Sequence, residues 1–219
     1  MTADPYPGGV NDWTEITTTD ELVALLGEPG ERARDKSRPA LLEVDRDWLA
    51  ASPFCVMATA AADGTCDASP KGDPAGSLVH VIDERTIAIA ERPGNRRADG
   101  YQNILANPHV GLLFLIPGRG DTLRINGRAR LVREAPFFDE MVVKGHRPLL
   151  AVVVDLEQVF FHCAKAFLRS GLWKPETWDP QAVVPKRADI AKAVERDPRS
   201  DEELEEYYKP ENYSKGLYG

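Results

Sequence analysis

Short β-like runs separated by turn residues dominate the middle of the chain and limit the folds that it can adopt. Beginning at Phe54, seven such runs follow one another: FCVMATA, CDASPK, LVHVI, TIAIA, HVGLLFLIP, DTLRINGRARLVRE and LLAVVVDLEQVFFHC. Most of their connections are too short for the crossover helix that parallel strands need. About six short strands with two or three inserted helices therefore predict a closed or partly closed antiparallel barrel.

Two of these runs carry more specific expectations. The run at residues 109–117 is almost entirely apolar, which is typical of a strand buried on both faces. The run at residues 121–134 alternates between apolar and polar side chains and contains Asn126-Gly127, a pair that could form a hairpin turn. We favour one long strand with a glycine bulge, because two halves of about five residues would be short.

Helices are expected on both sides of the β-like region. Thr18 and Glu21 have the spacing of a capping box and Gly27 is a suitable C-cap, so a short helix is predicted between them. A polar linker, EPGERARDKSRP, separates it from a second helix that begins near Asp45 and ends before Pro53. Further helices are expected at RRADGYQNILAN, APFFDEMVVKG, AKAFLRSGLW and DEELEEYYK.

The domain organisation follows from this pattern. We expect a helical extension at residues 1–50, the barrel at residues 51–175, and a C-terminal extension at residues 176–219 that packs on the barrel or on a partner. A chain of 219 residues is long enough to form one domain with such extensions.

Charge and hydropathy exclude several classes of protein. The formal net charge of −8 argues against general nucleic-acid binding. No apolar run approaches the roughly 18 residues of a membrane helix. The first residues lack the basic and apolar stretches of a secretory signal, so a cytoplasmic protein is expected. Arginine is frequent between Lys71 and Arg133, which favours a small anionic ligand.

The three cysteines do not form a disulfide framework. If Asp63-Gly64 is a two-residue turn, Cys55 lies opposite residue 72 and Cys66 opposite residue 61. Their sulfur atoms would then be roughly 18 Å apart, so we expect unpaired, buried thiols. His162 and Cys163 are adjacent in a strand and face opposite sides, so no metal site is expected there.

Basic residues at two turns form the best candidate for a binding site. Lys71 follows Ser69-Pro70, and Arg96-Arg97 follows Pro93-Gly94-Asn95 at the start of an expected helix. A helix N-terminus favours a phosphate, to which arginine adds paired donors and lysine a point charge. A solvated basic loop is the alternative interpretation.

These residues belong to a pattern that resembles a known family. The order FCVMATAAADGTCDASPKGDP, then TIAIAERPGNRRADGYQNILANPHVGLLFLIPG, then TLRINGRARLV resembles the FMN-binding split barrel of pyridoxamine 5′-phosphate oxidase-related proteins. The resemblance covers residues 50–175. Its last part, HCAKA followed by RS and LW, is similar to a bacterial branch of FMN-dependent proteins in this family.

The resemblance implies a mainly β fold with flanking helices, an antiparallel six-stranded split β-barrel that binds FMN. By similarity, Ser69 and Lys71 line the ribityl phosphate and the loop after TIAIA completes its cradle. Gln102, Asn103 and Arg124 lie near the flavin ring or the ribityl chain. Lys165, Arg169 and Trp173 come from the partner subunit or the barrel rim and lie near the ring or the substrate. The implied cofactor-binding residues are Ser69, Lys71, Asn95, Arg96, Arg97, Gln102, Asn103, Arg124, Lys165, Arg169 and Trp173.

The resemblance also implies a function. We expect an FMN-dependent oxidoreductase that acts on a small substrate or electron donor, as a homodimer with its cofactor sites at the subunit interface. The alternatives are a non-enzymatic flavin or haem binder and a deazaflavin-dependent reductase. The oxidase's C-terminal arginine motif for the substrate phosphate has no close match here, so pyridoxamine phosphate is not the expected substrate. No catalytic residue is assigned.

Overall fold

The computed structural model describes residues 13–179 and 184–218. The chain divides into two units, one ending at Lys36 and one beginning at Ser37. The first unit contains α1 (Thr19–Leu26) and α2 (Glu31–Arg34).

The capping box of α1 is confirmed: Thr18 Oγ1 accepts from Glu21 N at 3.2 Å, and Glu21 Oε2 accepts from Thr18 N at 3.3 Å. The backbone N–H groups of Thr17 and Thr18 both donate to the Glu21 carboxylate and lower its pKa. The linker after α1 was expected to be non-helical. This expectation was wrong, because Glu31–Arg34 form α2.

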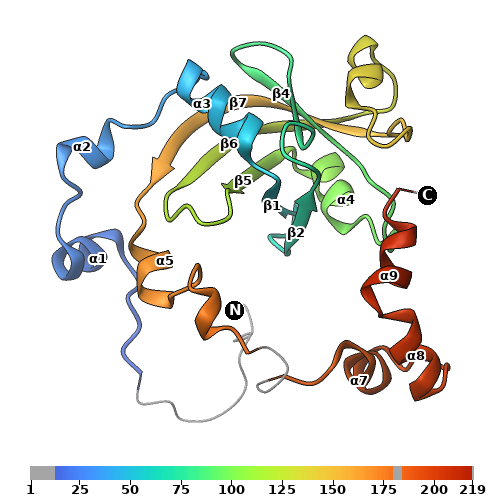
Figure 1. The fold of residues 1–219 in the computed structure, drawn as a ribbon. Coiled ribbons are helices and arrows are strands. Elements are labelled where there is room, and N and C mark those ends of the chain that lie inside the picture. The colour runs from blue at the N-terminus through green and yellow to red at the C-terminus, as the bar shows by residue number, and fades with distance from the viewer. Residues whose placement is uncertain (1–12, 180–183, 219) are drawn as a thin grey trace. The chain divides into compact units, whose positions relative to one another are not determined.

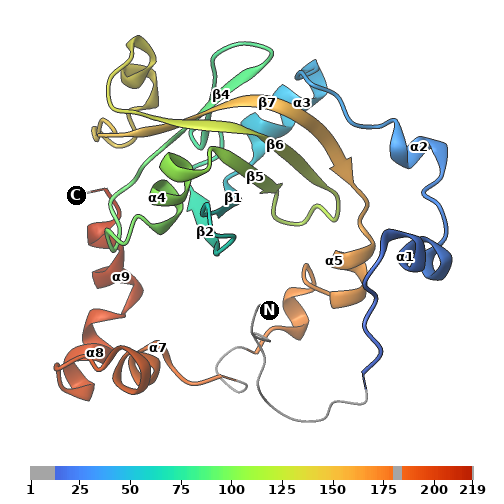
Figure 2. The same ribbon diagram turned by 180° about the vertical axis from the view of Figure 1, so that it is seen from behind.

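The second unit is built on one antiparallel sheet of seven strands, which is drawn from two sides in Figures 1 and 2. Its strand order is β2-β1-β5-β6-β7-β4-β3. The expected mainly β, antiparallel fold is confirmed, and all seven β-like runs form strands, one more than the six expected of the barrel. The strands are β1 (Phe54–Ala60), β2 (Cys66–Gly72), β3 (Val79–Val81), β4 (Thr86–Ala90), β5 (His109–Leu115), β6 (Thr122–Val132) and β7 (Ala151–His162).

The longest strands confirm one expectation and correct another. β6 is a single strand, and its register with β7 shifts between Asn126 and Gly127. The β7 backbone approaches so closely that a Cβ at Gly127 would collide with the carbonyl oxygen of Asp155. β5 was expected to be buried on both faces, but its burial alternates. Only the face with Val110, Leu112 and Phe114 packs on the core.

The hairpin between β1 and β2 has a longer turn than expected. Ala60 pairs with Cys66, and Cys55 pairs with Lys71 and not with residue 72. Asp63 Oδ1 accepts from Thr65 N at 2.9 Å, an interaction that favours a longer turn over a two-residue one. The thiols were expected to be buried, but only Cys55 is buried, while Cys66 and Cys163 are exposed. Burial raises the pKa of Cys55 to about 12.

The hydrophobic core lies on the inner face of the sheet and includes residues of α3 (Glu43–Ala51). The helix confirms the expected segment near Asp45 and packs Trp48 and Leu49 into the core. Arg38 donates two hydrogen bonds to the buried Asp45, which in turn accepts from Leu42 N at 2.8 Å. This network fixes the start of α3, so the helix is held against the sheet.

Other helices lie between the strands and after them. α4 (Asp99–Ala106) and α5 (Lys165–Ser170) confirm two expected helices. The helix expected at APFFDEMVVKG is only a 3₁₀ turn, η1 (Pro136–Met141), because its side chains Phe138 and Met141 turn into a second apolar cluster. No helix of the described residues is long and apolar enough to cross a membrane.

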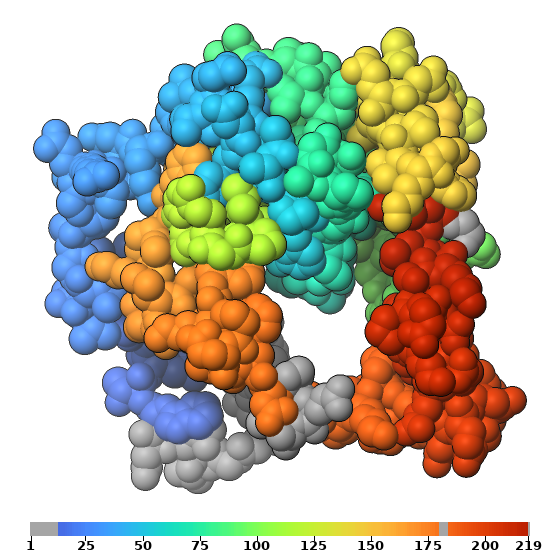
Figure 3. All heavy atoms as spheres, viewed as in Figure 1, coloured from blue at the N-terminus to red at the C-terminus, as the bar shows by residue number. Residues whose placement is uncertain are grey.

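The C-terminal segment forms several short helices. They are η2 (Pro175–Thr177), α7 (Arg187–Ile190), η3 (Ala191–Glu195), α8 (Asp201–Tyr207), α9 (Pro210–Tyr213) and η4 (Ser214–Gly216). α8 confirms the expected acidic helix and has a capping box between Ser200 and Glu203. Ala188, Ala191 and Leu204 form a small apolar cluster of their own. In Figure 3 the red spheres at the end of the chain meet the yellow spheres around residues 136–150.

Candidate functional site

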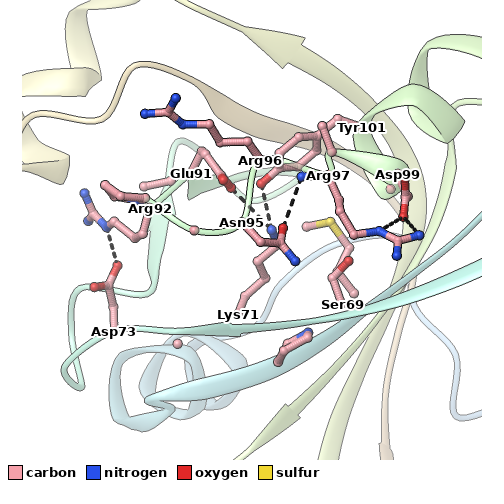
Figure 4. Close-up of a pocket in the computed structure, with 18 of the residues that line it drawn as sticks. Ser69, Lys71, Asp73, Glu91, Arg92, Asn95, Arg96, Arg97, Asp99 and Tyr101 are labelled. Carbon is pink, nitrogen blue, oxygen red and sulfur yellow. Dashed lines mark hydrogen bonds and ion pairs between the residues drawn. The ribbon is translucent and has the colours of Figure 1, made fainter. Parts of the chain in front are cut away.

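A cavity of about 560 Å³ lies between β2, the loop that follows β4, the start of α4 and the residues Leu217 and Tyr218. Figure 4 shows the side chains that line it. Its volume falls within the range of small-molecule sites, about 300–1,000 Å³. Five of the residues predicted from the sequence line this cavity: Ser69, Lys71, Asn95, Arg96 and Arg97.

The strand β2 supplies one wall through the alternation of its side chains. Asp67, Ser69 and Lys71 are half-buried, whereas the residues between them are exposed. Successive side chains of a strand point to opposite faces, so these three share one face. Ser69 Oγ donates to Asp67 Oδ2 at 2.8 Å. The regular strand therefore aims a hydroxyl and an ammonium group at the cavity.

Lys71 is held by two partners inside the cavity. Its Nζ donates to Tyr101 Oη at 2.7 Å and to Glu91 Oε2 at 3.3 Å. The same Nζ lies 4.6 Å from the centre of the Tyr101 ring. The Lys71 side chain is 17% exposed, so its position is well defined by these contacts.

The loop after β4 supplies the opposite wall. Arg96 and Ala98 have left-handed backbones, with φ of 61° and 59°, a conformation that costs energy for residues other than glycine. Asn95 Oδ1 accepts from Arg97 N at 3.1 Å and stabilises the turn. Arg96 and Arg97 were expected at the start of the helix, but α4 begins at Asp99, so they lie in the loop three and two residues before it.

Three cationic side chains of the cavity, Lys71, Arg92 and Arg97, pair with carboxylates. Arg97 pairs with Asp99 at 2.6 Å and is 75% exposed. Figure 4 shows the Arg96 side chain extending away from Lys71, and Arg97 turned towards Asp99. Four cations and four carboxylates line the cavity: Lys71, Arg92, Arg96, Arg97, Asp67, Asp73, Glu91 and Asp99. An anion entering the cavity would have to replace these carboxylates as partners of Lys71 and Arg97.

A second, more buried ion pair was not found from the sequence. Arg92 Nε lies 2.7 Å from Asp73 Oδ2, and the two side chains are 12% and 2% exposed. Arg92 Nη2 donates to the carbonyl of Met141 at 2.9 Å. The remaining Nη1 is buried, with no partner among the described residues. Asp73 follows Lys71 by two residues and Arg92 lies two residues after the end of β4, but only the folded sheet brings them together.

Two tyrosines were also missed. Tyr101 lies on α4, where a helix was predicted, but its contact with Lys71 spans 30 positions of sequence and has no local signal. Tyr218 Oη donates to Asp73 Oδ1 at 2.9 Å across 145 positions of sequence. Nothing in the local sequence around Tyr218 indicates this contact.

The other predicted cofactor residues do not line this cavity. Gln102 donates to the carbonyl of Arg97 at 3.3 Å, and Asn103 donates to Thr59 Oγ1 at 3.1 Å. Arg124 lies on the exposed face of β6, with its guanidinium 5.4 Å from the ring centre of Phe160. Their roles towards a cofactor stay predictions.

The predicted residues near the end of the barrel lie around α5. Lys165 and Arg169 are on this helix. Trp173 donates through Nε1 to the carbonyl of Arg119 at 2.6 Å and stacks on Phe167 at 5.7 Å. The expected contacts of these residues with a partner's cofactor stay predictions. Within the described parts of the chain, no group of three or more metal-ligating side chains is present.

Comparison with known proteins identifies a family. The model of the pyridoxamine 5′-phosphate oxidase family matches residues 41–163, which include every strand of the sheet. No curated protein matches the sequence.

Three solved structures illustrate the resemblance. Group A Streptococcus HupZ is 18% identical, with 55% of this chain and 93% of that chain covered and a TM-score of 0.45. A Clostridium acetobutylicum protein related to general stress protein 26, of the pyridoxinephosphate oxidase family, is 12% identical, with 54% and 85% covered and a TM-score of 0.42. A structure named F420 reductase is 16% identical, with 56% and 98% covered and a TM-score of 0.39.

Proposed function

The chain belongs to the pyridoxamine 5′-phosphate oxidase family, and from this we propose that it binds FMN in the cavity between β2 and the loop after β4 and uses it as an oxidoreductase on a small substrate. The observation that carries the proposal is the convergence of Ser69, Lys71, Asn95, Arg96 and Arg97 on one cavity. These residues were selected from the sequence as a phosphate cradle, and they come from two separate segments of the chain.

The donors of the cavity suit a phosphate monoester. Lys71 supplies a nearly buried ammonium group from β2, and Arg96 and Arg97 supply guanidinium groups from the opposite loop. Charge-assisted hydrogen bonds of these kinds are stronger than neutral ones. Arg92 also belongs to the lining, and its buried Nη1 has no hydrogen-bond partner within residues 13–179 and 184–218.

The chain's own residues would bind and orient the cofactor. Lys71 and Arg97 would exchange Glu91 and Asp99 for phosphate oxygens, and Tyr101 would hold the Lys71 ammonium group in place through its hydroxyl oxygen. Met57 and Leu78 give the cavity an apolar, water-excluding surface. When FMN is bound, it supplies the capacity to take up or release a hydride or electrons.

We further propose that the working form is a homodimer in the cytoplasm, in which α5 and Trp173 lie near the partner's cofactor. The support is the exposed apolar surface around α5, where Leu168 is 74% and Leu172 is 44% exposed. A two-fold contact is the commonest way for soluble proteins to cover such surface. Light scattering of FMN-loaded protein tests this, and a monomer mass at micromolar concentration would contradict it.

The absorption spectrum of protein purified without added cofactor tests the proposed function. A flavin spectrum, with FMN identified by mass analysis of the released ligand, is the expected result. Anaerobic reduction by dithionite or a pyridine nucleotide should bleach the flavin, and reoxidation by air or a substrate should restore it. A haem spectrum, a deazaflavin mass or a flavin that no donor reduces would each contradict the proposal and favour the corresponding alternative.

A further inference from the structure

The segment of residues 210–218, which comprises α9, η4, Leu217 and Tyr218, ends against the cavity assigned to FMN. Figures 1 and 2 both show its end beside the loop that leads from β4 to α4. Leu217 and Tyr218 line this cavity together with the residues of β2 and the loop. The same two residues line a neighbouring cavity of about 730 Å³, on the other side of the loop. The segment therefore forms part of the wall between two cavities.

Tyr218 is held in a specific socket. Its hydroxyl donates to Asp73 Oδ1 at 2.9 Å, the carboxylate that also accepts from Arg92. Its ring centre lies 5.9 Å from the Arg92 guanidinium carbon and 5.3 Å from Lys144 Nζ. The His146 ring stacks on it with centres 6.0 Å apart. An aromatic ring is attracted to cations on its face, so the socket matches both the polar and the aromatic parts of tyrosine.

Little else anchors the segment to the sheet. Leu217 is 50% exposed and Tyr213 is 53% exposed, and α9 contains four residues. A helix of this length has little stability of its own. Tyr218 is half-buried, and its contacts with Asp73, Arg92, Lys144 and His146 join the segment to three separate parts of the chain. Asn212 and Tyr213 join the segment to α8, so its attachment to the sheet depends mainly on Tyr218.

We propose that residues 210–218 are a latch that closes the cofactor cavity and limits the rate of ligand exchange, with Tyr218 as its fastening residue. The inference rests on the proposed function, because FMN is the ligand whose exchange the latch controls. A closed latch reduces the fraction of molecules that can take up or release FMN, and so slows both processes together. The hydroxyl of Tyr218 donates to Asp73, so Tyr218→Phe leaves the phosphate donors Lys71, Arg96 and Arg97 in place.

Stopped-flow fluorescence with FMN tests the latch in the full-length protein. In Tyr218→Phe, which removes only the hydroxyl bonded to a carboxylate, association and dissociation should both accelerate by about tenfold. Tyr218→Ala, which also removes the ring from the socket, should accelerate both further. Tyr213→Phe is the matched control, since it removes a hydroxyl from the same segment. The Tyr213 hydroxyl makes no assigned hydrogen bond within the described residues. Unchanged rates in Tyr218→Ala, or faster dissociation with unchanged association, would overturn the latch.

Amide hydrogen exchange separates the failure of the latch from the failure of the proposed function. In ligand-free protein, Tyr218→Phe should increase exchange throughout residues 210–218, whereas Tyr213→Phe should not do so to the same extent. If the wild-type protein binds no FMN, the proposed function fails and this measurement alone decides on the latch. Equal exchange in wild-type, Tyr218→Phe and Tyr218→Ala proteins would overturn it.

Discussion

The two walls of the cavity are built in different ways. The β2 wall is a regular strand whose inward side chains are half-buried and fixed by hydrogen bonds, as in the Lys71–Tyr101 contact. The opposite wall is a loop with two left-handed, non-glycine residues and exposed arginines. The β2 wall thus holds its polar groups in fixed positions, whereas the loop wall supplies exposed arginine side chains that can change conformation. We expect substitutions in the strand to affect stability and binding together, and substitutions in the loop to affect binding alone.

The largest expected effect is a loss of affinity from the loop. Replacing Arg96 and Arg97 together with Ala should weaken FMN binding at least about a hundredfold, because two charge-assisted interactions are lost. The thermal midpoint of the ligand-free protein should hardly change, because both side chains are exposed. A titration of ligand-free protein with FMN measures the affinity. Arg32→Ala combined with Arg34→Ala makes the same change of charge at exposed positions of α2 and is the control. Equal affinities in both double variants would remove the loop from the site.

A smaller but broader effect is expected from the strand. Lys71→Met should weaken FMN binding by about tenfold and also lower the free energy of unfolding by about 1–2 kcal/mol. The reason is that Glu91 and Tyr101 lose their shared partner in a site that is only partly open to water. Urea denaturation and FMN titration of the same variant measure the two effects. A loss of affinity with full stability would show that the two walls do not differ as described.

Removing the negative charge of a cavity carboxylate should strengthen FMN binding instead of weakening it. Glu91→Gln should strengthen FMN binding several-fold, because Lys71 then no longer has to leave a negatively charged partner. Asp99→Asn should do the same by a smaller factor, since the Arg97–Asp99 pair is more exposed to water. Titrations at low and moderate salt measure both variants. Weaker binding in Glu91→Gln would mean that this carboxylate supports the ligand instead of competing with it.

The smallest effect concerns the rigidity of the strand wall. Cys55 lies on β1 directly opposite Lys71, is buried, and has a pKa raised to about 12 by that burial. A thiol reagent at neutral pH should therefore modify Cys66 and Cys163 in the native protein and reach Cys55 only after unfolding. Mass analysis of the labelled protein with time gives the result. Rapid labelling of Cys55 would indicate that the β1–β2 hairpin opens readily.

The contrast between the walls also explains what could be predicted from the sequence. The strands and the capping box at Thr18 follow from local patterns, and the structure confirms both. Lys71, Arg96 and Arg97 line one cavity, and their role towards a cofactor stays a prediction. The hairpin register was wrong by one residue, because the side chain of Asp63 favours a longer turn. Contacts between distant segments had no local signal: Asp73 meets Arg92 and Tyr218 only because the fold places β2, β4 and the end of the chain together.

The central claim is that the cavity between the two walls is an FMN site, and a titration of ligand-free wild-type protein with FMN tests it most directly. Flavin fluorescence should change in a saturable way and reach its plateau at a ratio of about one FMN to one chain, as expected for a single enclosed pocket. Riboflavin, which lacks the phosphate, should bind much more weakly, because Lys71, Arg96 and Arg97 would have no anion to bind. Equal binding of FMN and riboflavin, or no saturable binding of FMN, would contradict the claim.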